Sequence, residues 1–468
     1  MLFSSVIFIF KFLPLTLLFY FLVRHSYRNI FLLTVSLIFY AWGEPIYVLL
    51  MILSIIVNYF FGLLIERNPE SRSRLAMFIG VLVNVMFLIY FKYFWFITQN
   101  INDLFHWNIG DSQPIALPIG ISFYTFQSLS YLIDVYRKNV KAQSNIINVG
   151  LYISFFPQLI AGPIVRYTDI NEQIAHRKIE WAGFVPGVER FIIGLAKKVL
   201  LANTLGEVAD KIFVLPHEEI TVLCSWLGIL CYAFQIFFDF SGYSDMAIGL
   251  GRMFGFTFQE NFNYPYAAKS LKDFWRRWHI SLSSWFRDYL YIPLGGNRGT
   301  VIRTHINLII GFFITGLWHG ASWNFVIWGL FHGFFLILER GRFGVWMERR
   351  WAPIRHLYAL LVVVVAWVFF RLDTFDEAWS YLKIMTGISL QGDYPFDFID
   401  FINQKVLICF IAAIIFSISW GKRKTIGEPG VIEIVRRSVT AIFLICLFIL
   451  SIANIASDTY NPFIYFRF

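Results

Sequence analysis

The sequence predicts an all-α, polytopic membrane protein with roughly 11 to 13 transmembrane or re-entrant helices. Hydrophobic residues make up 58% of the 468 residues and charged residues only 15%, well below the roughly 25% usual in soluble domains. Apolar runs recur from Met1 almost to Phe468, and several approach the about 20 residues that a helix needs to cross a bilayer. No long polar segment separates them, so we expect one membrane domain over residues 1–468.

Short loops between the apolar runs carry most of the basic residues. Under the positive-inside rule these loops face the cytoplasm. The net charge of +9 therefore reflects topology and contact with anionic membrane lipid, and no nucleic-acid partner is expected. Arg24 and Arg28 place the first loop inside, whereas residues 98–114 contain no Lys or Arg and are assigned outside. Five spans are predicted in this half, namely the first apolar run, which precedes Arg24, and residues 29–42, 46–65, 75–96 and 118–136.

The middle of the chain gives a weaker helix signal. Pro157, Pro163 and the Lys197/Lys198 pair interrupt the apolar runs between residues 146 and 205, so broken or re-entrant helices are expected there. The last third is clearer. Spans are predicted near 357–370, 406–420 and 438–456, with basic segments at 340–355 and 422–437 assigned inside and an acidic segment at 373–400 assigned outside.

The stretch TGLWHGASWN, residues 315–324, places His319 in an apolar segment without a neighbouring charged residue. Apolar surroundings disfavour the charged imidazolium, so the ring is expected to stay neutral and able to accept a proton as a general base. A structural histidine that hydrogen-bonds a neighbouring helix fits the segment equally well. His332 lies about 220° further around a continuous helix, and we interpret it as structural.

A second candidate region covers residues 269–298. As one helix, this segment would place its polar residues within about 80° of arc, with Ser270 and Asp273 as a capping box at its start. We interpret it as a basic amphipathic helix on the cytoplasmic surface, whose arginines bind either lipid phosphate or the phosphates of a CoA-like donor. The predicted polar stripe contains Arg276, His279, Ser283 and Arg287.

Residues 235–251 carry Asp239 and Asp245 in an otherwise apolar run, with Gln235 one turn before Asp239. A polar network that holds a helix break and the lining of a tunnel explain these side chains equally well. A metal site is not expected, because no His or Cys lies near them at ligand spacing. The four cysteines lie in apolar runs without C-x-x-C spacing, so we interpret them as packing residues.

Three long motifs point to a family. They are DFSGYSDMAIG at 239–249, NYPYAAKSLKDFWRRWHISLSSWFRDYLYIPLGGNR at 263–298 and GLWHGASWNFVIWGLFHG at 316–333. With them the chain resembles the membrane-bound O-acyltransferase (MBOAT) family, and within it the bacterial branch of alginate O-acetyltransferase membrane subunits; the most specific region is 239–333. The resemblance implies a helical shell around a central tunnel, with His319 as the central catalytic histidine and His279 as the second.

The resemblance also implies a reaction. The chain would take an acetyl group from acetyl-CoA on the cytoplasmic side of the bacterial inner membrane, with no bound cofactor, for O-acetylation of an exported polysaccharide such as alginate. The implied partners are a separately encoded SGNH-type extracytoplasmic acetyltransferase and the polysaccharide export machinery. The substrate-binding residues that we assign are Arg276, Ser283, Asp239, Ser241, Tyr243 and Asn324.

Our hypothesis is that His319 deprotonates the acceptor hydroxyl and that His279 orients His319 or the donor thioester; an acetyl-histidine intermediate is the alternative. Peptidoglycan O-acetylation and teichoic acid D-alanylation are alternative uses of the same chemistry. A transporter or channel is the alternative from a different class. Such a protein would carry paired acids and bases within its spans, and the sequence offers few.

Overall fold

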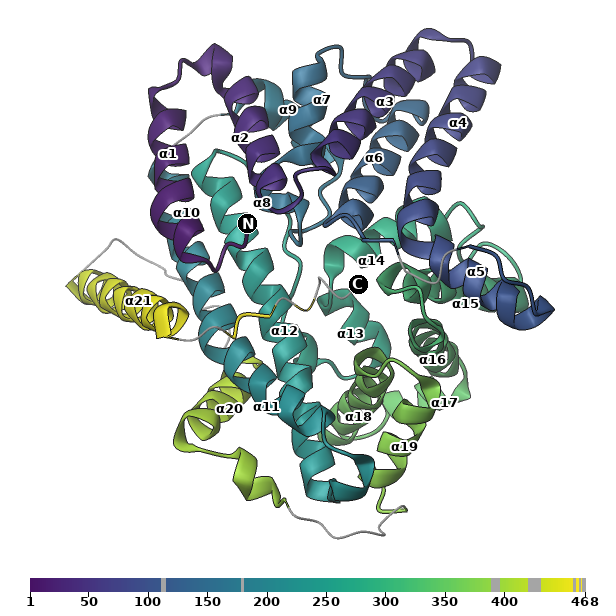
Figure 1. Cartoon of the computed structure of the whole chain (residues 1–468), viewed down its shortest axis with the longest axis vertical. Coiled ribbons are helices and arrows are strands. Elements are labelled where there is room, and N and C mark those ends of the chain that lie inside the picture. Colours follow the sequence, from purple (N-terminus) through teal and green to yellow (C-terminus); the bar gives the residue numbers. More distant parts are fainter. Residues whose placement is uncertain are drawn as a thin grey trace. The chain divides into compact units, whose positions relative to one another are not determined.

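The computed structural model describes residues 1–110, 115–177, 181–388, 396–419, 431–457, 460–462 and 464. The described residues form helices and no strand, as Figure 1 shows, which confirms the all-α prediction. The chain divides into two compact units. The N-terminal unit comprises Met1–Phe191 and Ser244–Gln259, and the C-terminal unit comprises Ile192–Tyr243 and Glu260–Phe468. One membrane domain over the whole chain stays a prediction.

The helices of the N-terminal unit follow the predicted spans, with shifts at their ends. They are α1 (Leu13–Leu22), α2 (Arg28–Gly43), α3 (Val48–Arg67), α4 (Glu70–Leu88), α5 (Phe94–Phe105), α6 (Ile121–Tyr136), α7 (Ile146–Ser154), α8 (Phe156–Leu159) and α9 (Tyr167–His176), followed by α10 (Trp181–Ala196), which ends in the other unit. Helix α3 stops at Arg67 because Pro69 disfavours a helical conformation at Asn68, which is extended with a ψ of 155°.

Helical structure after α4 extends further than the sequence predicts. A π-helical turn (Ile89–Tyr93) joins α4 to α5, which runs to Phe105, beyond the predicted end of this span at residue 96. No proline or glycine occurs between residues 89 and 105 to stop the helix. It ends at His106, whose φ of 53° lies in the left-handed region.

The C-terminal unit carries both histidines of the resemblance. Its helices are α11 (Asn203–Phe213), most of α12 (Val222–Met253), α13 (Leu271–Arg277), α14 (Ile280–Phe286), α15 (Val301–His319), α16 (Trp323–Arg340), α17 (Arg342–Glu348), α18 (Ala352–Arg371), α19 (Phe375–Met385), α20 (Gln404–Phe416) and α21 (Val431–Ser457). A π-helix, η4 (Lys197–Ala202), leads into α11. Cys224 and Cys231 are buried, as expected of packing residues, and Cys409 is partly buried, whereas Cys446 is exposed.

Six helices of the described part are long and apolar enough to cross a membrane, which supports a multi-pass membrane protein. They are Val48–Arg67, Glu70–Phe105, Val222–Met253, Val301–His319, Ala352–Arg371 and Val435–Ser457. The roughly 11 to 13 segments of the prediction include shorter and re-entrant helices as well as full spans. The expected breaks after residue 146 are confirmed, because α7, α8 and α9 are short and Pro157 lies in α8.

Helices α15 and α16 pack against each other and form the hairpin that carries His319. Helix α15 ends at His319 because Gly320 is extended, with φ −165° and ψ 151°. Glycines bring the two helices close together. A Cβ atom on Gly316 would lie 2.3 Å from the Phe325 carbonyl oxygen, and one on Gly329 would lie 2.2 Å from that of Phe312. Only glycine allows so close an approach of the two backbones.

Gly316→Ala is expected to destabilise the protein by about 1–3 kcal/mol, because the added methyl group would force α15 and α16 apart. The matched control is Gly311→Ala on the same helix, where an added Cβ meets nothing within 4 Å and alanine improves helix propensity. Thermal unfolding in detergent should show a lower Tm for Gly316→Ala than for Gly311→Ala. Equal Tm values would contradict the close packing of this hairpin.

Candidate active site

His319 lies inside a shell of aromatic side chains at the end of α15. Its side chain is 3% exposed. The ring centroids of Trp318, Trp328 and Phe370 lie 4.8, 4.9 and 5.1 Å from that of the imidazole. The predicted apolar surroundings are therefore confirmed. Such a shell disfavours a charged ring and excludes water from the site.

His279 occupies a break between α13 and α14, and it is fully buried. Its φ of 44° is left-handed, which is strained for a residue with a Cβ atom. Asn261 holds this conformation in place. Its backbone carbonyl accepts a hydrogen bond from the N–H of Ile280 at 2.9 Å, and its side-chain oxygen accepts one from the N–H of Ser281 at 3.2 Å. The strained turn is thus fixed by the segment that precedes α13.

The single amphipathic helix predicted around His279 is wrong. The left-handed turn at His279 separates α13 from α14, so Arg276 and Ser283 do not belong to one helical stripe. The predicted start of the helix is confirmed, because the Ser270 hydroxyl accepts a hydrogen bond from the N–H of Asp273 at 3.0 Å. The sequence pattern could not show the break, since no glycine or proline marks it.

The hydrogen bonds of Asn261 also indicate which nitrogen of His279 carries the hydrogen. The Asn261 Oδ1 atom accepts hydrogen bonds from the backbone N–H and, at 2.8 Å, from the hydroxyl of Ser281, so it is the amide oxygen. The same oxygen lies 3.1 Å from His279 Nδ1. An acceptor at this position requires a hydrogen on Nδ1. Nε2 is then the basic nitrogen of the neutral ring.

Trp318 contacts both candidate catalytic histidines. Its ring centroid lies 4.8 Å from that of His319 and 6.1 Å from that of His279. Phe240 also packs against His279, and the two ring centroids lie 4.6 Å apart. The structure therefore brings together two histidines from separate motifs, within one buried aromatic cluster.

His332 packs against the same indole as His319, although the two histidines are far apart in sequence. The Trp328 centroid lies 4.9 Å from that of His319 and 5.0 Å from that of His332. The break at Gly320 makes this approach possible, because one continuous helix would hold the two rings apart. His332 is fully buried, and neither of its ring nitrogens has a hydrogen-bond partner among the described residues. The structural interpretation of His332 stays a prediction.

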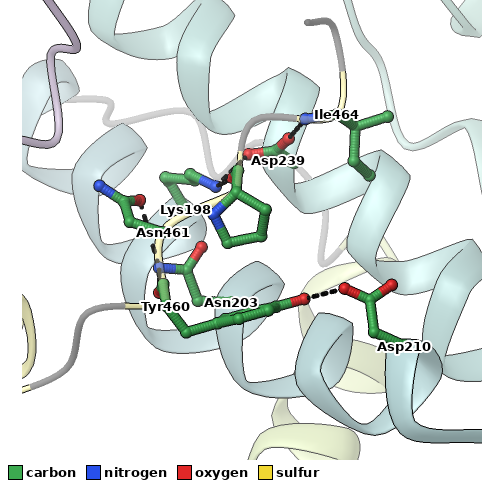
Figure 2. Close-up of polar contacts among 8 residues, drawn as sticks. Lys198, Asn203, Asp210, Asp239, Tyr460, Asn461 and Ile464 are labelled. Carbon is green, nitrogen blue, oxygen red and sulfur yellow. Dashed lines mark hydrogen bonds and ion pairs between the residues drawn. The ribbon is translucent and has the colours of Figure 1, made fainter. Parts of the chain in front are cut away.

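Asp239 forms a buried ion pair in the C-terminal unit, shown in Figure 2. Its Oδ1 atom lies 2.8 Å from Lys198 Nζ, and both side chains are 2% exposed. Lys198 lies in η4, whereas Asp239 lies in an uninterrupted part of α12. Of the two sequence interpretations, a polar network fits the contacts, but it does not hold a helix break. Asp245 forms its own ion pair in the N-terminal unit, 2.6 Å from Arg190.

Residues near the C-terminus complete the network around Asp239 (Figure 2). The N–H of Ile464 donates to Asp239 Oδ2 at 3.0 Å, and Lys198 Nζ donates to the carbonyl oxygen of Pro462. Tyr460 donates its hydroxyl hydrogen to Asp210 on α11 at 2.6 Å. The ion pair is thus covered by chain that follows the last long helix.

Comparison with known proteins identifies the family. The family model of MBOAT, the membrane-bound O-acyltransferase family, matches residues 82–372. The chain belongs to this family. The match includes both candidate histidines, Asn261 and the Lys198–Asp239 ion pair, whereas the residues near the C-terminus that cover the pair lie outside it.

Curated relatives of this MBOAT protein are similar over most of its length. The probable alginate O-acetylase AlgI of Azotobacter vinelandii is 38% identical over 509 residues, covering 100% of both chains. The probable alginate O-acetylase AlgI of Pseudomonas aeruginosa is 45% identical over 393 residues, covering 82% of this chain and 75% of that protein. The peptidoglycan O-acetyltransferase of Helicobacter pylori is 37% identical over 425 residues, covering 83% and 80%. The chain is therefore a membrane O-acyltransferase.

The other predicted substrate-binding residues of this MBOAT chain lie in different environments. Arg276 is exposed in the last turn of α13, and the Ser283 hydroxyl donates to the Trp278 carbonyl oxygen at 3.4 Å. Three buried residues, Ser241, Tyr243 and Asn324, lie on α12 and α16. The Ser241 hydroxyl and Asn324 Oδ1 have no hydrogen-bond partner among the described residues. Their role in substrate binding stays a prediction.

No group of three or more His, Cys, Asp or Glu side chains in the described part of the chain could hold a metal ion. Sequence reasoning missed Asn261 and Ser281 as parts of this site, whereas it predicted tryptophan beside His319. Trp318 had a signal, since it directly precedes His319, whereas Asn261 gave none in a polar segment typical of a loop.

Proposed function

We propose that the chain transfers acetyl groups from cytoplasmic acetyl-CoA for the O-acetylation of an exported polysaccharide such as alginate. The observation that carries the proposal is that two buried histidines, His319 and His279, both contact the ring of Trp318. Family membership supplies the acyl transfer, and the names of two relatives support alginate as the acceptor. The protein would act in the bacterial inner membrane, and no resident cofactor is required.

In the proposed reaction, a ring nitrogen of His319 accepts the proton of the acceptor hydroxyl as its oxygen attacks the thioester carbonyl carbon. The carbon–sulfur bond then breaks, the thiolate of CoA takes the proton from His319, and an ester and a free thiol are formed. His279 orients His319 or the thioester. Of the two, only a ring N–H of His319 can donate a hydrogen bond to the basic Nε2 of His279. A dry aromatic site favours this route because it keeps the imidazole neutral and limits hydrolysis of the donor. An acetyl-histidine intermediate is the alternative.

We also propose which molecules receive the acetyl group on the far side of the membrane. We assign the hydroxyl that attacks the thioester to a separately encoded SGNH-type acetyltransferase. That partner then passes the acetyl group to the polysaccharide and acts with the export machinery. Peptidoglycan is the second candidate acceptor, because the Helicobacter pylori relative named for that activity matches 83% of the chain.

The proposed function is tested by ester-linked acetate in each polysaccharide fraction of wild-type and deletion cells. Loss of acetate from one exported polysaccharide would name the acceptor. Loss from peptidoglycan alone would replace alginate with the second candidate, and loss from no fraction would contradict the proposal and favour a transporter. Inside-out vesicles given acetyl-labelled CoA test the donor, since label should enter the acceptor only when the chain is present.

Asn261→Ala is expected to lower the kcat of acyl transfer by about 10- to 100-fold, because a misplaced catalytic group costs about that much. The variant removes the side-chain oxygen that accepts from His279 Nδ1 and from the N–H of Ser281. It keeps the backbone carbonyl that accepts from the N–H of Ile280. Ser281→Ala is the matched control, since it removes one hydroxyl donor and leaves the Asn261 oxygen facing His279. The rate of acyl transfer per folded molecule should fall much more in Asn261→Ala than in Ser281→Ala. An equal loss in both variants would show that Asn261 does not position His279.

A further inference from the structure

Two arginines of the N-terminal unit lie on the same tyrosine ring. Arg28 is the first residue of α2, and Arg177 directly follows α9. Their guanidinium carbons lie 5.2 and 5.8 Å from the ring centroid of Tyr20 on α1. The positive-inside rule accounts for a basic residue in the first loop, but it does not account for a second arginine buried beside it.

Arg177 is only 7% exposed, yet its partners are uncharged. Its Nε donates to the Tyr20 hydroxyl oxygen at 2.9 Å, and its Nη1 donates to Asn29 Oδ1 at 2.6 Å. The Phe256 ring lies 4.7 Å from the guanidinium carbon. Buried charges in proteins are normally paired with an opposite charge, because burial alone is costly. The contacts of Arg177 orient its charge and do not neutralise it.

A network of neutral groups holds Arg177 in this orientation. The Tyr20 hydroxyl donates its hydrogen to the Phe254 carbonyl oxygen at 2.8 Å, so it meets Arg177 as an acceptor. The Asn29 amide nitrogen donates to Asn148 Oδ1 at 2.8 Å and to the Ile174 carbonyl oxygen at 2.9 Å, which fixes Asn29 Oδ1 towards Arg177. The side chains around the arginine are thus arranged before any ligand binds.

Each arginine has one donor atom that makes no hydrogen bond to the described residues. Arg177 Nη2 and Arg28 Nε are buried, and neither has a hydrogen-bond partner among the described residues. No carboxylate of the described chain forms an ion pair with either arginine. Two guanidinium groups with such N–H donors match the oxygens of a phosphate group, which arginine binds through paired hydrogen bonds.

Exposed apolar side chains lie on α1 and α2, the two helices that carry Tyr20 and Arg28. Leu18, Phe19 and Leu22 of α1 are 54%, 51% and 71% exposed, and Ile30 of α2 is 45% exposed. A ligand that combines a phosphate with long apolar chains would contact both features. We propose that Arg28 and Arg177 bind the phosphate of an anionic membrane phospholipid, whose acyl chains lie along the exposed faces of α1 and α2.

The test uses the purified full-length protein and native mass spectrometry with added phosphatidylglycerol. Arg177→Gln and Arg28→Gln should each weaken lipid binding by about tenfold or more, because each removes charged hydrogen bonds to phosphate. The matched control is Arg24→Gln, which replaces an exposed arginine of the same loop and should bind as wild type does. Equal binding by all four proteins would overturn the proposal.

A second arm separates a lipid from a soluble phosphate. Inorganic phosphate at millimolar concentration should not displace phosphatidylglycerol from the wild-type protein, whereas full displacement would replace the lipid by a soluble phosphate ligand. Because Arg177→Gln alters a buried network, thermal unfolding provides an independent readout. Phosphatidylglycerol should raise the Tm of wild type and Arg24→Gln but not that of Arg28→Gln, whose side chain is only half-buried. An equal rise in Arg28→Gln would also overturn the proposal.

Discussion

Replacing His319 with phenylalanine should lower acyl transfer by about 10²- to 10⁴-fold, which is the contribution usual for a general base. Phenylalanine keeps an aromatic ring of similar size among Trp318, Trp328 and Phe370, so the shell should remain packed. What the substitution removes is the nitrogen lone pair. Ester-linked acetate in cells that contain normal membrane levels of His319→Phe should therefore fall to the level of the deletion strain.

The matched control for this prediction is His332→Phe. His332 is equally buried and packs on the same indole, and its ring nitrogens have no hydrogen-bond partner within the described residues. Replacing a buried, unsatisfied polar group with an apolar one of the same shape is nearly neutral or stabilising. Acetylation should therefore persist in His332→Phe. Loss of acetylation in both variants would indicate that the aromatic cluster, and not a base, is what matters.

Lys198→Met should destabilise the protein by about 3–5 kcal/mol, because it leaves the buried Asp239 carboxylate without its opposite charge. The pair lies 2.8 Å apart with both side chains almost fully buried. The double variant Lys198→Met/Asp239→Leu should recover most of the lost stability, since a buried ion pair can be replaced by apolar residues at little cost. The Tm of purified protein in detergent is measured for wild type, Lys198→Met, Asp239→Leu and the double variant. The four values show how strongly the two residues are coupled energetically.

An exposed ion pair on α11 provides the control for Lys198. Lys211 Nζ lies 2.7 Å from Glu207 Oε1, but both side chains are solvent-exposed. Lys211→Met should therefore change stability by no more than about 1 kcal/mol. If Lys198→Met and Lys211→Met lower the Tm equally, burial does not make the loss of Lys198 more costly than the loss of an exposed lysine.

The sequence was sufficient to predict the helical class, most spans in the first half and the breaks after residue 146. Apolar runs and prolines act locally, so they can be recognised without tertiary contacts. The aromatic setting of His319 was predictable for the same reason, because Trp318 is its neighbour in the chain. The pairing of His319 with His279 followed from the resemblance alone, and the structure supplies the shared contact with Trp318.

The left-handed turn at His279 could not be predicted, because tertiary contacts stabilise it. Asn261 precedes it by many residues and imposes a conformation that His279 would not adopt alone. The covering of the Lys198–Asp239 pair was missed for the same reason, since Ile464 is distant in sequence from both. Periodicity describes each helix separately and cannot show what a distant segment adds to it.

The most direct test of the central claim is the initial rate of acetyl transfer by purified protein in liposomes, with acetyl-CoA outside and an accepting polysaccharide and its SGNH-type partner inside. The rate is measured per mole of folded protein for wild type, His319→Phe and His332→Phe. The account predicts a wild-type rate for His332→Phe and a rate about 10² to 10⁴ times lower for His319→Phe. A His319→Phe rate equal to that of wild type would contradict it.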